Sequence, residues 1–307
     1  MKFNFKIERV FLISVSLFLI SLIYFAMTSP ITLQKILSLK AFNKSISIYK
    51  EGFTTTTEQE LSDFIENIPY RGDDASSSWF INPKLLYEDT IINGNGNCSN
   101  LAFGAMFEFN NLRRQAAIIH MLKNDFGFLV GVGHTVLQIN VEGRNTIVDI
   151  LEGGVPLQNK KGIDALRFNL NLTDVYSHQN FSNLKDNKND YFTNDYLAQI
   201  SFGLIPQNEI SDYFLFLDRV YLPLGSVFFE KLVFDNLAVL FGQYPNTYVS
   251  KDFLLSTFQN AKLKTLLAYL NLISYHLSYI TFLLLNVKLV IKVLKRNMNN
   301  KRAIKPN

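Results

Sequence analysis

Residues 134–149 read HTVLQINVEGRNTIVD and carry the clearest structural signal in the chain. Two apolar runs rich in β-branched residues flank the pair Glu142-Gly143, which is typical of the tight turn of a β-hairpin. If these two residues form the turn, His134 and Asp149 lie on the same face as diagonal neighbours, about 7–8 Å apart at the backbone. The stretch therefore predicts an antiparallel hairpin whose His and Asp side chains can form a hydrogen bond.

Asp149 is an unusual residue for an apolar strand, because a buried carboxylate without a partner is costly. His134 alone could be an ordinary hydrogen-bonded histidine at a strand end. Together the two residues suggest a functional pair, in which the carboxylate fixes the imidazole tautomer and the second ring nitrogen faces another group.

The single cysteine supplies a candidate for that group. Residues 93–103 read NGNGNCSNLAF, so Cys98 lies where a Gly/Asn-rich turn meets a helix predicted over 99–112. A helix N-terminus favours the thiolate, which is the nucleophilic form of cysteine. A lone cysteine is more often a small buried hydrophobe. With His134 and Asp149, however, Cys98 completes a nucleophile, base and orienting acid.

These elements resemble the transglutaminase-like superfamily of papain-type cysteine enzymes. The resemblance covers roughly residues 58–155, about a third of the chain, and rests on Gly96-x-Cys98 at a helix start, a strand after that helix, Gly133-His134-Thr135, and Asp149 across a hairpin. It implies an α+β, papain-like core in which the cysteine helix packs on an antiparallel sheet. It also implies Cys98 as nucleophile, His134 as general base and acid, Asp149 as orienter, and no cofactor.

The chemistry expected of such a site is acyl transfer from an amide or ester carbonyl to Cys98. Water as acceptor gives a protease or amidase, and an amine gives a transglutaminase. The Cys98 backbone N–H plus one further donor would hold the oxyanion, with Asn97, Trp79 and Tyr87 as candidates. Two alternatives stay open: an inactive papain-like module that binds or assembles envelope components, and a structural membrane protein with an accidental Cys, His and Asp.

Two uncharged segments flank the body of the chain. Of the 307 residues 48% are hydrophobic and only 18% charged, and the uncharged segments cover 10–27 and 265–287. Each is long enough for a transmembrane helix, although a signal peptide and a buried helix are the respective alternatives. Residues 288–307 carry seven Lys or Arg and no acid, which favours a cytoplasmic C-terminus.

The net charge of +4 belongs to the two tails. Residues 1–9 contribute +2 and residues 288–307 contribute +7, so residues 10–287 hold −5. An acidic body argues against nucleic acid as a partner. The expected partners are a protein, peptide or amide substrate, the lipid bilayer, and a partner protein of the cell envelope. One cysteine excludes an intramolecular disulfide and a four-cysteine zinc site, and the histidines lack metal-ligand spacing.

The expected location is a bacterial inner membrane with the catalytic domain outside the cytoplasm. Asn97-Cys98-Ser99 matches the acceptor sequence for glycosylation, and in a eukaryotic secretory route a glycan on Asn97 would obstruct the thiol.

Within the body, helices are predicted over 58–68 and 99–112, and strands over 116–121, 135–141 and 144–150. The segments are a cytoplasmic tail (1–9), a transmembrane anchor (10–27), a tether (28–57), the transglutaminase-like catalytic domain (58–205), an aromatic-rich amphipathic helical region (206–262), a second transmembrane helix (265–287) and a basic cytoplasmic tail (288–307).

Overall fold

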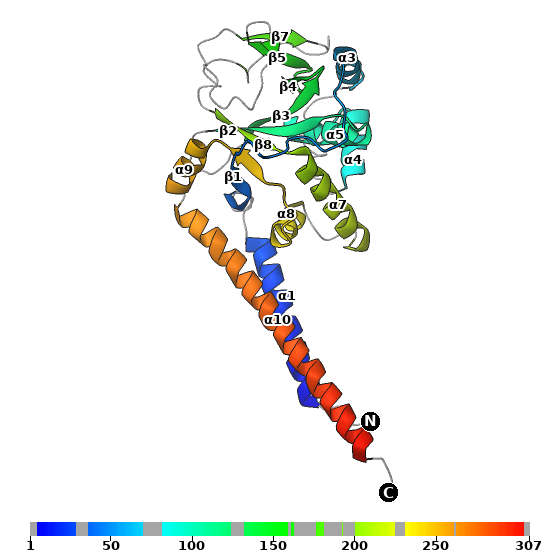
Figure 1. Ribbon diagram of the computed structural model, residues 1–307, viewed down its shortest axis with the longest axis vertical. Coiled ribbons are helices and arrows are strands. Elements are labelled where there is room, and N and C mark those ends of the chain that lie inside the picture. The colour runs from blue at the N-terminus through cyan, green and yellow to red at the C-terminus, as the bar shows by residue number, and fades with distance from the viewer. Residues whose placement is uncertain are drawn as a thin grey trace. The chain divides into compact units, whose positions relative to one another are not determined.

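The computed structural model divides the chain into two compact units (Figure 1). One contains Met1–Pro30 with Leu266–Asn307, and the other contains Ile31–Thr265. The structure describes residues 5–28, 36–69, 82–123, 132–158, 161–162, 176–180, 192, 200–224, 231–260 and 262–303. Each unit is described below by itself.

The terminal unit consists of α1 (Phe5–Thr28) and most of α10 (Lys262–Ala303). Their side chains touch: Phe18 stacks on Phe282 with 5.0 Å between ring centroids, and the Ser21 hydroxyl lies 3.1 Å from that of Ser278. Apolar residues are distributed around both helices and do not form one apolar face, as expected of segments that do not pack on a single protein core.

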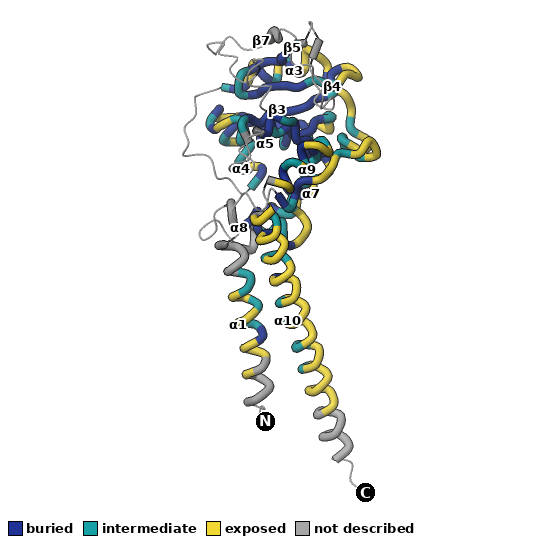
Figure 2. Tube along the Cα trace, turned by 90° about the vertical axis from the view of Figure 1, so that its left-hand side faces the viewer, coloured by how far each residue is buried: buried dark blue, intermediate teal, exposed yellow. Residues whose placement is uncertain are grey.

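One helix of the described residues is long and apolar enough to cross a membrane. It runs from Thr265 to Lys295, and none of its most apolar stretch is buried (Figure 2). This confirms an apolar helix at the second predicted span and extends it beyond residue 287. The first predicted span, 10–27, is helical throughout, but its apolar part within the described residues is the shorter Phe11–Leu22.

The larger unit is an α+β domain, which confirms the α+β part of the predicted fold class. Its strands form a six-stranded sheet in the order β1-β9-β8-β2-β3-β4 and a three-stranded sheet in the order β6-β5-β7. The strands are β1 (Leu39–Ala41), β2 (Ala116–Lys123), β3 (Val132–Val141), β4 (Arg144–Val148), β5 (Gly154–Gln158), β6 (Lys161–Gly162), β7 (Tyr176–Asn180), β8 (Ile200–Ile205) and β9 (Thr247–Val249). The helices are α3 (Glu58–Glu66), α4 (Pro83–Tyr87), the π-helical turn η2 (Glu88–Ile92), α5 (Cys98–Asn111), α7 (Gln207–Leu224), α8 (Lys231–Leu240) and α9 (Lys251–Asn260).

The large sheet is mixed rather than purely antiparallel, because β1 and β9 pair in parallel. These two strands correct the sequence prediction. The segment 28–57 is not only a tether, since β1 belongs to the sheet, and the region 206–262 is not wholly helical, since β9 pairs with both β1 and β8. Strands of three residues are too short to show the alternation of apolar and polar residues that identifies a strand.

The predicted hairpin is confirmed in its register. Val141 pairs with Arg144 and Leu137 with Val148, so Glu142 and Gly143 form the turn. Both turn residues have positive φ, 50° and 85°, as the turn types that match the twist of a hairpin require. The hairpin is joined to the rest of the sheet through β2, which pairs antiparallel with β3.

Helix α5 packs against β3 and β2 and belongs to the larger of two hydrophobic clusters (Figure 1). Its contributions to that cluster are Leu101, Ala102, Ala105, Met106 and Phe109, all buried. Alternate residues of the strands enter different clusters: Leu137 packs with α5, whereas Val136 belongs to the second cluster. The central strands β2 and β3 are therefore covered on both faces and form the buried centre of the unit (Figure 2).

The approach of α5 to η2 requires glycine at position 104. A Cβ atom there would lie 2.0 Å from Thr90 Oγ1, and Thr90 is fully buried and donates to the carbonyl of Leu86 at 2.7 Å. Neither side of this contact can move freely. The close packing fixes the position of the helix that begins with Cys98.

We predict that Gly104→Ala lowers the free energy of unfolding by about 2 kcal/mol, because overpacking typically costs about 1–3 kcal/mol and outweighs the gain of up to about 1 kcal/mol in helix propensity. Urea unfolding of the full chain in detergent measures the effect. In a Thr90→Ala background the loss should shrink, since the clashing hydroxyl is gone. Equal losses in the two backgrounds would contradict the contact.

Candidate active site

The hairpin brings His134 and Asp149 together. The ring nitrogen Nε2 of His134 lies 2.6 Å from Asp149 Oδ2, and both side chains are fully buried. The predicted hydrogen bond between these residues is confirmed. A bond of this length between a buried imidazole and a buried carboxylate is typical of a charge-assisted pair.

The second oxygen of Asp149 is also held. Oδ1 accepts a hydrogen bond of 3.1 Å from the backbone N–H of Glu152. The backbone of Asp149 exchanges two hydrogen bonds with Gly154, at 2.9 and 3.0 Å, where β4 passes into β5. The backbone around Asp149 thus holds the carboxylate in position to bond to the histidine.

The loop before α5 has the sharp turns that its glycines predict. Gly94 and Gly96 both have positive φ, 71° and 119°. A Cβ at Gly96 would also lie only 2.9 Å from the Cβ of Asn100. The loop is fastened to η2 by Asn95, whose side-chain amide donates to Asp89 Oδ1 at 3.1 Å and whose backbone N–H donates to the Asp89 carbonyl at 3.1 Å.

Cys98 is the first residue of α5 and is half-buried. Asn97 is the N-cap, and its side chain accepts a hydrogen bond of 3.1 Å from the N–H of Asn100. The N–H groups of Cys98 and Ser99 have no acceptor within the helix, as at every helix start. The thiol is therefore beside unpaired donors and the positive end of a helix dipole.

Cys98 also lies close to the histidine. Its side chain is near enough to the His134 ring to contribute to the raised pKa of that ring. Since Nε2 of the ring is held by Asp149, Nδ1 is the nitrogen left to interact with the thiol. The three residues predicted from sequence thus lie near one another.

The environment of His134 favours its protonated form. Burial by itself lowers the pKa of the imidazole, but the charge and hydrogen bond of Asp149, together with the side chain of Cys98, outweigh burial and raise the pKa from 6.5 to about 10. At neutral pH the ring is therefore an imidazolium between a carboxylate and a thiol. Such a ring can stabilise a thiolate and donate a proton to a leaving group.

The three residues predicted to hold the oxyanion have different outcomes in the structure. The Asn97 side-chain oxygen is occupied as the helix cap, although the residue itself adjoins the thiol. Tyr87 interacts with Glu108, ten residues along α5 from Cys98 and thus about 15 Å away at 1.5 Å per residue. This contradicts Tyr87 as a donor at the thiol. Trp79 lies outside the described residues.

The role of Asp89 in positioning the loop could not be predicted from sequence. Its place six residues before Asn95, in a stretch that mixes polar and apolar residues, does not distinguish an anchor of the loop from a solvated acid. His120 bonds within the sheet: its Nδ1 lies 3.1 Å from Thr135 Oγ1, a pairing across β2 and β3. The His178 side chain lies outside the described part.

Comparisons of the chain with protein-family models, with curated proteins and with solved structures give no match. No group of three or more His, Cys, Asp or Glu side chains within the described residues could hold a metal ion. The chemistry of the site is that of a half-buried thiol beside a buried imidazolium–carboxylate pair. This arrangement can carry out nucleophilic attack followed by proton donation.

We predict that the His134 ring titrates near pH 10 in the full chain, followed by NMR of 13C-labelled histidine with the signal assigned by its loss in His134→Ala. Asp149→Asn should bring this pKa to 6.5 or below, because burial then acts without the opposing carboxylate charge. Asp212→Asn, on the exposed side of α7, is the matched control and should leave the titration unchanged.

The proton bound by the His134 ring also contributes to the free energy of unfolding. The folded state binds it more tightly than the unfolded state, so the stabilisation is complete below about pH 6.5 and is lost as the pH rises through about 10. An unfolding midpoint that stays constant over this alkaline range, or falls equally in Asp149→Asn, would contradict the ion pair.

Proposed function

We propose that the chain is a membrane-anchored cysteine enzyme of the transglutaminase-like, papain-type class, which transfers an acyl group from an amide or peptide bond through a thioester on Cys98. Water is the default acceptor, which makes the enzyme a protease or amidase. The observation that supports this proposal best is the buried hydrogen-bonded pair of His134 and Asp149, whose ring lies near the side chain of Cys98.

In the first step the Cys98 thiolate attacks the substrate carbonyl carbon. The developing oxyanion is stabilised by the N–H of Cys98 and the positive end of α5. The C–N bond then breaks, and the His134 imidazolium gives its proton to the leaving amine. The products of this step are a free amine and a thioester, with neutral imidazole held in place by Asp149.

In the second step the neutral imidazole accepts a proton from water as the water oxygen attacks the thioester carbon. The C–S bond breaks, the carboxylic acid product leaves, and the thiolate–imidazolium pair is restored. A primary amine in place of water would give a new amide by the same proton transfers. Because Asp149 is buried, its charge acts on the His134 ring without competition from bulk water throughout the cycle.

The membrane setting of the proposal uses two spans, α1 and α10, with residues 28–264 outside the cytoplasm. The apolar helix from Thr265 to Lys295 and the basic residues after residue 287 support this orientation. The proposed setting is a bacterial inner membrane, where a peptide or amide of the cell envelope would be the substrate.

The first test is the alkylation of Cys98 by iodoacetamide at pH 7 in the full chain. A free thiol is only a few per cent thiolate at this pH, so an ion pair with His134 should raise the rate about tenfold over an unfolded control. His134→Ala should abolish this gain. His276→Ala, the same substitution in the exposed part of α10, should leave the rate unchanged.

A second experiment separates the acceptors. A peptide mixture is incubated with the chain in 18O-labelled water, with and without cadaverine, and the products are analysed by mass spectrometry. New carboxyl groups with 18O show hydrolysis, and products with the cadaverine mass show transfer. A thiol that is no more reactive than in the unfolded chain, together with no product of either kind, would contradict the enzyme and favour the binding or assembly module.

We predict that reporter fusions at both termini are cytoplasmic. A paired phosphatase and fluorescent-protein fusion at each end distinguishes the two sides of the membrane. An external reporter at either end overturns the two-span arrangement, while the chemistry proposed for Cys98 is tested separately by the alkylation.

A further inference from the structure

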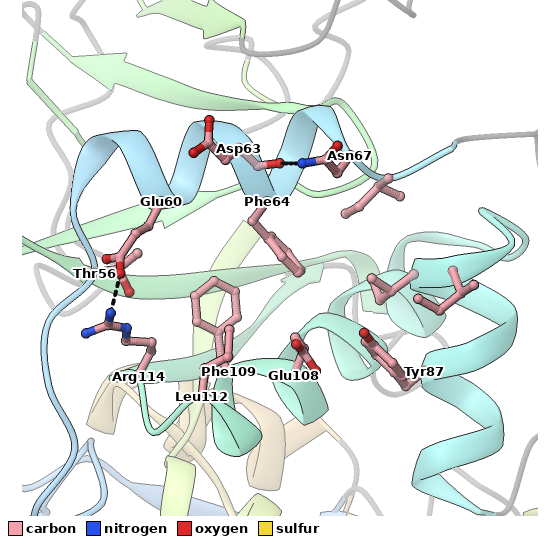
Figure 3. A pocket seen from close by; sticks show the side chains of 13 residues that line it. Thr56, Glu60, Asp63, Phe64, Asn67, Tyr87, Glu108, Phe109, Leu112 and Arg114 are labelled. Carbon is pink, nitrogen blue, oxygen red and sulfur yellow. Dashed lines mark hydrogen bonds and ion pairs between the residues drawn. The ribbon is translucent and has the colours of Figure 1, made fainter.

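A groove of about 450 Å³ lies on the larger unit, away from Cys98, between α3 and the C-terminal half of α5 (Figure 3). Phe64 from α3 and Phe109 from α5 contact each other in its lining, with 5.1 Å between ring centroids in an edge-on arrangement. Tyr87 lies toward one end, and the ion pair of Glu60 with Arg114 lies toward the other. The walls are thus aromatic and the ends are polar.

The charges of the lining residues do not balance. Glu60, Asp63 and Glu108 line the groove with Arg114 as the only cation of the lining, a net charge of −2. Arg114 is fully engaged, because it bonds to Glu60, to the Thr54 hydroxyl at 2.7 Å and to the Thr55 carbonyl at 3.0 Å. The charge of Arg114 is therefore used in bonds within the wall of the groove, and the net charge of the lining is negative.

Glu108 is the carboxylate that faces the interior. It is half-buried on α5 and forms no ion pair within the described part of the chain. Burial and the neighbouring Glu108 charge raise the pKa of Tyr87, so the Tyr87 hydroxyl near this carboxylate stays protonated. Asp63 differs: its carboxylate points away from the groove and accepts from Gln59 at 2.7 Å (Figure 3).

Thr56 provides an independent indication of a ligand. It lines the groove and only 2% of its surface is exposed, yet its hydroxyl has no hydrogen-bond partner among the described residues. Leaving a buried polar group unpaired costs about 1–3 kcal/mol. A hydroxyl kept at that cost on the wall of a groove is explained by a polar ligand that pairs with it.

From this geometry we propose that the groove between α3 and α5 binds the side chain of a lysine or arginine of a peptide chain. The cation meets Glu108, the apolar stem packs over the contacting rings of Phe64 and Phe109, and a polar atom of the ligand pairs with Thr56. An aromatic wall beside a carboxylate suits a cation on a hydrocarbon stem, because the ring faces attract the charge and the rings bury the methylenes. The proposal concerns binding alone and does not depend on the chemistry of Cys98.

The test is calorimetric titration of the full chain in detergent, with Cys98→Ser to prevent any turnover. The probes are capped alanine tripeptides with arginine, lysine or norleucine in the middle, and n-butylguanidinium as the cation without a peptide. The arginine and lysine peptides should bind at least about tenfold more tightly than the norleucine peptide, since a charged hydrogen bond contributes about 1.5–3 kcal/mol.

Two substitutions that each remove one negative charge locate the site. Glu108→Gln should weaken the basic peptides about tenfold or more, whereas Asp63→Asn, whose carboxylate turns away, should weaken them less than about twofold. Thr56→Val should weaken them several-fold without lowering the unfolding midpoint, because it removes an unpaired buried hydroxyl and keeps the shape.

The outcomes decide the proposal in both directions. Selectivity for the basic peptides together with a loss confined to Glu108→Gln and Thr56→Val supports it. Equal binding of the norleucine peptide, equal effects of Glu108→Gln and Asp63→Asn, or no binding at millimolar peptide overturns it. If n-butylguanidinium binds as tightly as the peptides, the ligand is a free cation, and the assignment to a peptide side chain is wrong.

Discussion

The pairing of a buried imidazole with a buried carboxylate constrains the larger unit more than any other interaction. A charge in the interior must be compensated where it lies, and the carboxylate of Asp149 bonds to a histidine across the hairpin and to the backbone N–H of Glu152. This requirement fixes the register of β3 on β4, because a slip by one residue would turn one partner to the other face. It also explains why two polar residues are tolerated in strands that are otherwise apolar.

The residues near the thiol could be predicted from sequence because each of their elements has a local signature. A turn pair between two β-branched runs defined the hairpin, and glycines before an apolar helix defined the loop at Cys98. The spacing of Thr57 and Glu60 is likewise the sequence signature of the capping box that begins α3. The sheet as a whole could not be predicted in this way. β1 and β9 are three residues each, and their parallel pairing joins positions about 200 residues apart, which no local pattern encodes.

The residues that hold the site in place could not be predicted from sequence, for a related reason. Asp89 holds the loop before Cys98 and Thr90 receives the helix at Gly104, but both lie in a π-helical turn with no strong periodicity. The groove was hidden as well, since it is formed by α3 and α5, which are separated in sequence and meet only in the fold. Cys98 and Glu108 lie on one helix, so the thiol and the groove are held at a fixed separation of about 15 Å by ten residues of α5.

The turn at Glu142 and Gly143 carries a further consequence for how related chains can differ. Exposed hairpin turns usually accept insertions and deletions, because nothing is packed against them, and no atom lies within 4 Å of a Cβ built at Gly143. Here the length of the turn sets the alignment of two buried side chains many residues away. Evolution can therefore change the amino acids of this turn within the limits of their positive φ angles, but a gain or loss of a single residue would separate His134 from Asp149 without touching either of them.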